Sequence, residues 1–201
     1  MKKIIVILIA VLLVFSSCAT QAGVARVDSS TQIDLSGYWN DTDVRIVCEA
    51  LIRDCLSSQR VDQAIRAFGN KTPMVIVGRF RNESSEHIDT SIISSTMETT
   101  IFNSGRLDFV AGGATRDALR AERNDQQGNA SENTAAALAN ETGANFMLTG
   151  SVKAIVDRAG NQTVRTYFVN AEMTNIENNQ RMWMGQNSDI KKVVTRAKNK
   201  L

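Results

Sequence analysis

Residues 73–110 read PMVIVGRFRNESSEHIDTSIISSTMETTIFNSGRLDFV, and this stretch decides the fold. The only proline of the chain, Pro73, introduces a β-branched run at 74–80, which predicts a central strand buried on both faces. Apolar residues at three- and four-residue spacing then predict a helix over 88–105. A short second strand is expected over 107–111. A strand, a helix and a second strand in this order place a helix against a sheet.

Two amphipathic helices are expected before this stretch. Apolar residues recur at helical spacing over 44–55, and Asp41 or Thr42 is expected to cap that helix. A second helical pattern covers 61–68 and stops at the glycine that follows, a common residue at helix ends. The residues IDLSG at 33–37 predict a short strand ahead of both helices.

The part of the chain after residue 110 is expected to add helices and an antiparallel meander. The expected elements are a helix over 115–124, a polar loop over 124–134, a short helix over 135–143, and strands over 146–156, 162–176 and 181–185. The basic end KKVVTRAKNKL, at 191–201, is expected to fray. Together the elements predict an α+β fold, an open α/β sandwich in which helices pack against a small mixed or antiparallel sheet.

The N-terminus has the pattern of a lipoprotein signal. Two lysines precede an apolar run of twelve residues at 4–15, too short for a helix that must cross about 30 Å of hydrocarbon. Two serines then lead into Cys18, an order similar to the bacterial lipobox. We therefore expect a signal peptide at 1–17, lipid attachment at Cys18, a tether at 18–32 and a single globular domain at 33–201. The alternative is a plain secretion signal with Cys18 as an ordinary thiol.

The charge of the mature chain gives no reason to expect nucleic-acid binding. The formal net charge is +2, and the signal carries two lysines and no acids, so the charge falls to 0 when residues 1–17 are removed. Cys48 and Cys55 lie seven residues apart on one predicted helix. A rise of about 1.5 Å per residue separates their Cα atoms by about 10 Å, too far for a disulfide, so both are expected to be buried thiols.

The sequence contains no positive sign of catalysis, and no metal or cofactor is expected. His87 is the only histidine, so three or four clustered zinc ligands cannot be assembled with two helix-buried cysteines. The chain has no phosphate-binding or dinucleotide glycine motif and no serine-nucleophile motif. Because acidic residues are scattered along the chain, a hydrolase that uses carboxylates alone stays open as an alternative.

Four residues are candidates for binding a partner because they gather at the end of the predicted strand and in the loop after it. These residues are Arg79, Arg81, Asn82 and His87. The alternative for His87 is a solvated position before a helix that Asp89 caps.

The two tryptophans, Trp39 and Trp183, are expected to pack in the core or at its rim. If either is exposed, it would suit a partner hot spot.

Several motifs occur in order behind the signal and resemble one family. Residues 82–89 read NESSEHID, 104–110 read SGRLDFV, 143–150 read GANFMLTG, and 181–183 read RMW. These motifs resemble the LpoB-type activators of penicillin-binding proteins, over roughly residues 33–193.

The resemblance implies a non-catalytic lipoprotein held in the outer membrane, with its domain in the periplasm and a fold similar to the amino-terminal domain of TolB. Its implied partner is a class A penicillin-binding protein, a bifunctional peptidoglycan synthase. Thr20, which is not acidic, also favours the outer membrane.

The tether departs from the best-known members, whose domain follows a long disordered segment. The fourteen residues at 19–32 span at most about 50 Å. Two other functions stay open: a structural lipoprotein of an envelope or secretion complex with a TolB-like domain, and a lipoprotein that binds a small ligand.

Overall fold

The computed structural model describes residues 25–28, 30–110, 118–119, 121 and 143–197. Residues 32–201 form a compact unit that is distinct from residues 1–31. The elements below all belong to the former unit.

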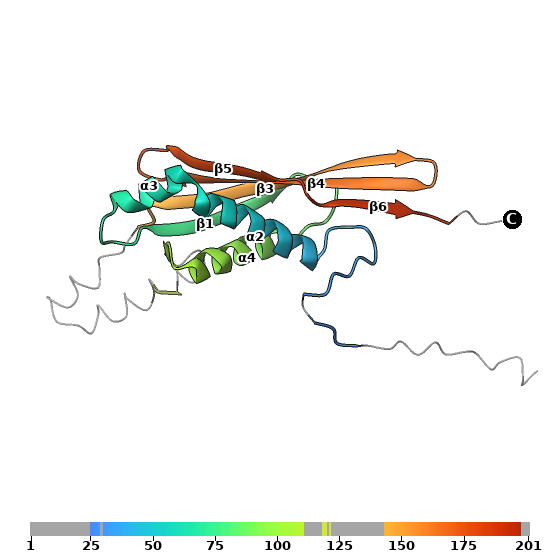
Figure 1. Ribbon diagram of the computed structural model, residues 1–201, viewed down its shortest axis with the longest axis horizontal. Coiled ribbons are helices and arrows are strands. Elements are labelled where there is room, and N and C mark those ends of the chain that lie inside the picture. Colours follow the sequence, from blue (N-terminus) through green and yellow to red (C-terminus); the bar gives the residue numbers. More distant parts are fainter. Residues whose placement is uncertain (1–24, 29, 111–117, 120, 122–142, 198–201) are drawn as a thin grey trace, which may run out of the picture. The chain divides into compact units, whose positions relative to one another are not determined.

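Three helices, α2 (Asp41–Ser57), α3 (Gln59–Ala67) and α4 (Thr90–Ser104), lie on one face of the sheet (Figure 1). The apolar stripe predicted for the first helix is buried in full, which confirms the helical spacing: Val44, Val47, Cys48, Leu51, Ile52 and Cys55. Both cysteines are buried free thiols, as expected. Among the described residues, no helix combines the length and the apolar character that crossing a membrane requires.

The helix ends follow local hydrogen bonding. The N-cap of α2 is Asn40, and the prediction of Asp41 or Thr42 was wrong. Asn40 and Asp43 form a capping box, in which each side chain accepts a hydrogen bond from the other's backbone N–H, at 3.1 and 2.9 Å. Asp89 caps α4, and Gly105 ends that helix at a positive φ of 65°, both as predicted.

The sheet is mixed, as predicted. Its strands are β1 (Met74–Asn82), β2 (Asp108–Phe109), β3 (Phe146–Ala159), β4 (Gln162–Asn175), β5 (Arg181–Asn187) and β6 (Lys191–Thr195). The strand order is β2-β1-β3-β4-β5, and β6 also pairs with β4. β1 runs parallel to β2 and β3, whereas β3, β4, β5 and β6 pair antiparallel.

The core lies between the sheet and the helices. Alternate residues of β4 face the helices and are buried, which agrees with the strand predicted over 162–176: Tyr167, Val169, Ala171 and Met173. Trp183 is only 7% exposed, and its Nε1–H donates to Asp54 at 2.9 Å. The ring of Trp39 packs edge-on against Tyr167 at 5.2 Å between centroids. Both tryptophans therefore pack, as the sequence favoured.

The prediction for β1 was wrong in part. The strand is internal to the sheet, as predicted, since it lies between the two-residue β2 and β3. It is not buried on both faces, however, since only Val75 and Phe80 of its nine residues are buried. The reason is that the described helices cover only one face of the sheet, so the β-branched run packs on that face alone.

Two predictions near the ends of the domain were also wrong. Residues 33–37 form no strand, and the chain bends there, with Gly37 at a φ of 68°. Residues 191–195 do not fray but form β6, which pairs with residues 162–166 of β4. β5 pairs only with 169–174 of that strand and leaves the rest of its edge for β6.

The region after β2 is described only in part. The second strand is shorter than the predicted 107–111. The helix predicted over 115–124 lies outside the described residues except at 118, 119 and 121, which are helical. The loop at 124–134 and nearly all of the helix predicted over 135–143 also lie outside them.

β3 and β4 form a long hairpin that extends past the ends of the helices (Figure 1). β1 pairs with β3 only as far as Val152, so the rest of the hairpin has β6 as its one additional strand among the described residues. We call this three-stranded part, residues 153–166 and 191–195, the arm.

Candidate functional site

The four predicted contact residues surround one hollow of about 810 Å³ at the end of β1. Arg79 and Arg81 lie in the strand, and Asn82 is its last residue. His87 lies near the end of the loop that leads from β1 to α4. Each of the four is exposed. The structure thus brings together all four residues that the sequence singled out.

Asn82 uses its side chain to shape the loop. Its Nδ2 donates to the Glu86 carbonyl at 2.7 Å, and its Oδ1 accepts from the Ser84 N–H at 3.0 Å. These bonds form a local turn of the kind that asparagine favours. The His87 side chain is exposed to solvent and makes no hydrogen bond to another described residue.

A buried ionic cluster ties this loop to β4. Arg165 Nε lies 3.0 Å from Glu86 Oε1, and both side chains are only 9% exposed. The Tyr167 hydroxyl donates to Glu86 Oε2 at 2.7 Å. Burial, followed by this hydrogen bond, raises the pKa of Tyr167, so the phenol stays protonated. Because the loop is held from inside, its exposed residues are presented in a fixed arrangement.

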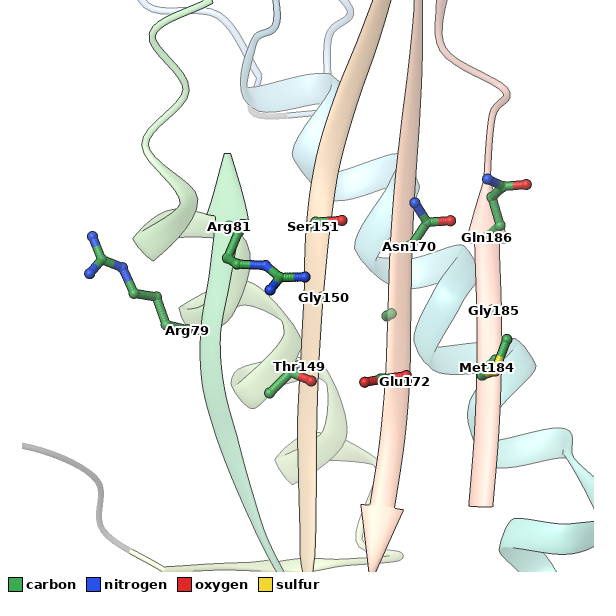
Figure 2. A pocket seen from close by; sticks show the side chains of 11 residues that line it. Arg79, Arg81, Thr149, Gly150, Ser151, Asn170, Glu172, Met184, Gly185 and Gln186 are labelled. Atoms are coloured by element: carbon green, nitrogen blue, oxygen red, sulfur yellow. The ribbon is translucent and has the colours of Figure 1, made fainter. Parts of the chain in front are cut away.

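A β-bulge in β1 sets the directions in which the Arg79 and Arg81 side chains point. Val77 pairs with Leu148 and Phe80 with Gly150, so Gly78 and Arg79 together oppose a single residue of β3. After the bulge, Phe80 is buried on the helix side. Arg81 therefore lies on the face opposite the helices, which we call the open face. Figure 2 shows the Arg81 side chain directed over β3 and the Arg79 side chain directed away from it.

A second hollow, of about 590 Å³, lies on the open face beside Arg79 and Arg81 (Figure 2). Paired residues from four strands make one polar row across it: Arg81, Ser151, Asn170 and Gln186. The next row is Thr149, Glu172 and Met184. Between them, Gly150, Ala171 and Gly185 pair with one another, and because the Cβ positions of this row point to the helix side, its backbone forms the floor of the hollow.

Sequence reasoning missed this second hollow. The signal was present in β4, where Asn170 and Glu172 alternate with the apolar residues of the buried face. The register that aligns them with Ser151 and Gln186 could not be read from the sequence.

Among the described residues of this region, Arg81 and Arg181 form ion pairs and Arg79 does not. Glu83 lies between Arg81 and Lys153, at 3.3 and 3.2 Å, and Glu172 pairs with Arg181 at 2.8 Å. Arg79, which borders both hollows, forms no ion pair with another described residue. A surface of guanidinium, amide and hydroxyl groups is suited to binding a polar or acidic protein surface.

The remaining reactive groups lie elsewhere or are masked by burial. Burial raises the pKa of the Cys48 and Cys55 thiols to about 12, so neither is a thiolate at neutral pH. Within the described part of the chain, no three histidine, cysteine or acidic side chains lie together as metal ligands would. Cys18, the expected lipid-attachment residue, lies outside the described residues.

In the described part of the chain, this α+β domain has helices on one sheet face only and an exposed polar loop that is braced from inside, so it presents surfaces suited to binding. The chain belongs to the LpoB family of peptidoglycan-synthase activators, whose family model matches residues 43–188. The family consists of regulators of the synthase, and the chain is accordingly a non-catalytic protein.

Several solved structures are similar to this chain, and two of them are LpoB domains. The LpoB C-terminal domain from Escherichia coli has 14% sequence identity and a TM-score of 0.45, with 77% of this chain and 99% of that chain covered. The same domain from Salmonella enterica has 14% identity and a TM-score of 0.43 over the same shares. Lipoprotein GNA1162 from Neisseria meningitidis has 15% identity and a TM-score of 0.39, covering 63% and 88%. A search of curated proteins found no significant match.

Proposed function

We propose that this protein is a lipoprotein of the outer membrane that binds a class A penicillin-binding protein in the periplasm and activates it allosterically. The observation that carries the proposal is the family match over residues 43–188, most of the domain. In this proposal residues 1–17 are a cleaved signal, Cys18 carries the lipid, 18–32 are the tether and 33–201 are the binding domain.

Activation requires no chemistry from the activator. The domain need only bind an active conformation of the synthase more tightly than an inactive one, and a coupling free energy of about 1–3 kcal/mol is typical. A braced binding loop suits this role, because a surface already fixed in its bound arrangement loses less conformational entropy on association. Glu86, with its bonds to Arg165 and Tyr167, supplies that bracing.

The test of the function is a two-component assay. The full lipoprotein, purified in detergent, is added to the class A synthase of the same cell, and glycan polymerisation and peptide cross-linking are measured. We expect both rates to rise with a saturable dependence on the lipoprotein. If a synthase that is active alone is neither bound nor stimulated, the proposed function is wrong, and a structural role in an envelope complex becomes the better hypothesis.

We further propose that the loop at the end of β1 is the contact surface, through Arg79, Arg81, Asn82 and His87. Replacing Arg79 and His87 together by alanine should weaken synthase binding about tenfold or more, as hot-spot substitutions of roughly 1.4 kcal/mol and above do. The thermal midpoint should not change, since both side chains are exposed.

The matched control replaces Arg53 and Arg60, exposed residues of α2 and α3, by alanine. That variant should bind like the unsubstituted chain. Equal affinity of the two double variants would exclude the loop as the contact surface.

A further inference from the structure

The open face of the arm carries a patch of apolar side chains. Val164 and Val193 are paired across β4 and β6, so they stand side by side on this face. Ile155 pairs with residue 166 and is therefore diagonal to Val164 and to Phe168, the next open-face residue of β4. Ile155 is 62% exposed and Val193 is 60% exposed, whereas Val164 and Phe168 are half-buried. Contiguous apolar side chains on an exposed face indicate a contact surface.

The opposite face of the arm is already covered by the residues that precede α2. The Arg165 guanidinium lies over the Tyr38 ring, 4.1 Å from its centroid. Lys192 Nζ lies 2.7 Å from Asp34 Oδ1 and donates to the Tyr38 carbonyl at 2.9 Å. The side chains of Arg165 and Lys192 are thereby taken up within the domain. Only the open face of the arm is left for a contact outside it.

The same contacts fix the point at which the tether enters the domain. The compact unit begins at residue 32, two residues before Asp34, and Lys192 of β6 binds that aspartate. The chain therefore enters the domain at the arm. The proposed tether of fourteen residues spans about 21 Å on average. A lipid at Cys18 keeps the arm near the bilayer at an effective concentration of about a millimolar, so a weak surface contact is enough to hold it there.

The charge of the arm suits a bilayer that contains anionic phospholipids. The arm and the residue after it, Arg196, include six basic residues and one acidic residue, Asp157. Lys191 stands on the open face beside the apolar patch, and Arg158 and Arg196 lie at the tip of the arm. These three basic residues are exposed and form no ion pair with another described residue. Basic side chains around an apolar patch are the usual composition of a surface that binds a bilayer interface.

We infer that the open face of the arm docks reversibly on the surface of an anionic phospholipid bilayer. The apolar patch enters the boundary between headgroups and acyl chains. Lys191, Arg158 and Arg196 lie at the level of the phosphate groups, with their aliphatic stems against the lipid. The strand backbone stays in the hydrated headgroup layer, so the edge of β3 keeps water as its hydrogen-bond partner.

Docking through the arm orients the domain as well as holding it. A lipid at the end of a flexible tether fixes only the distance of the domain, whereas a second contact also limits the directions in which it can turn. Two features favour a bilayer over a protein as the occupant: the entry of the tether at the arm and the excess of basic charge. The inference rests on the lipid attachment proposed at Cys18 and does not depend on the synthase.

Short-range quenching of a fluorophore by lipid tests the docking. The full lipoprotein with Ile155→Cys is labelled and placed in vesicles of phosphatidylethanolamine and phosphatidylglycerol, with brominated acyl chains as the quencher. Burial raises the pKa of the Cys48 and Cys55 thiols to about 12, so they react little, and the unsubstituted chain measures the background. The matched control is Phe102→Cys in α4, which is also 62% exposed but lies on the helix side of the sheet.

We expect the label at residue 155 to be quenched several times more strongly than the label at residue 102. In the I155C background, Lys191→Glu should lower the quenching severalfold, because it places a negative charge against the phosphate groups. Lys71→Glu, the same change at an exposed lysine before β1, should leave the quenching unchanged. Asp157→Asn should increase the quenching, because it removes the acidic charge from the docking face.

Equal quenching at residues 155 and 102 would overturn the docking, and equal effects of K191E and K71E would overturn the role of charge on this face. A label at residue 155 that is shielded from aqueous iodide but not quenched by lipid would assign the face to a second copy of the chain. Chains that do not float with the vesicles would overturn both the docking and the lipid attachment. The assay with purified synthase in detergent would still decide the proposed activation, since it requires no bilayer.

Discussion

At the scale of single residues, three small side chains in register shape both sides of the sheet. Gly150, Ala171 and Gly185 pair across β3, β4 and β5. On the helix side, a Cβ atom at Gly150 would lie 2.2 Å from the Phe80 ring, and one at Gly185 would lie 2.2 Å from the Trp183 indole. The two aromatic rings thus occupy the space that the missing side chains leave. On the open face the same row is the floor of the hollow.

The first prediction follows from this packing. Gly150→Ala should lower the free energy of unfolding by about 1–3 kcal/mol, the range for an overpacked core. The added methyl group would meet the buried Phe80 ring and the Asn170 carbonyl oxygen, which is fixed backbone. Urea titration measures the change. The control is Thr149→Ala, one residue away on the open face, which should stay within about 0.5 kcal/mol of the unsubstituted chain. Equal stability of both variants would contradict the tight fit.

The sequence identified residues whose contacts are with near neighbours in the chain, and it missed residues whose contacts are far away in the chain. The spacing of the first helix correctly buried Cys48 and Cys55. The cluster of Glu86, Arg165 and Tyr167 had no signal, because its members lie up to 81 residues apart and only the strand register brings them together. The contact candidates could be proposed from position alone, since a loop after a strand is exposed in most folds.

At the scale of elements, the short strand β6 closes the domain. Lys192 Nζ lies 2.6 Å from Asp43 Oδ2 and 2.7 Å from Asp34 Oδ1, and it also donates to the Tyr38 carbonyl at 2.9 Å. The Lys192 side chain is 10% exposed and that of Asp43 is 5% exposed. A basic run of this composition predicts a frayed tail. It becomes a strand because two acidic residues near the start of the domain, more than 140 residues earlier, hold its lysine.

The second prediction is that Lys192→Met destabilises the domain by about 3–5 kcal/mol, the usual effect of removing one member of a buried ion pair. Burial raises the pKa of Asp43, and Lys192 opposes that increase, so the variant leaves a buried carboxylate without its cation. Lys191→Met, on the exposed neighbour in the same strand, is the control and should change little.

The stability lost in Lys192→Met should depend on pH in a direction that the pKa shifts of Asp43 and Asp34 determine. Without Lys192 the pKa of Asp43 rises further, so protonation as the pH falls removes the unpaired charge and restores stability to the variant. In the unsubstituted chain, hydrogen bonds from Lys192 and Gln32 lower the pKa of Asp34 to about 2, and that contribution is lost as the pH falls toward this value. The stability difference between the two chains should therefore shrink from pH 7 to pH 4, as followed by thermal unfolding. A constant difference would assign the loss to packing of the lysine side chain.

At the scale of the whole molecule, the proposed function requires the domain to reach its partner from a membrane. The proposed tether supplies at most about 50 Å when extended, and about 21 Å on average as a flexible chain of fourteen residues.

The fold class was predictable from the order of the elements, because helices and strands with one apolar face each have few ways to pack. That the described helices all cover the same face of the sheet was not predictable, since the sequence does not state which face a helix packs against.

The last prediction tests reach separately from binding. Deleting residues 21–28 removes up to about 29 Å of extended tether and should reduce site-specific cross-linking to the synthase in living cells by severalfold. The same variant in detergent should stimulate the purified synthase like the unsubstituted chain, because no membrane then limits the approach of the two proteins. Replacing the same eight residues by glycine and serine keeps the length and should preserve cross-linking in cells. Undiminished cross-linking of the shortened chain in cells would mean that the synthase itself extends to the lipoprotein, and that the position of the domain is not limited by its tether.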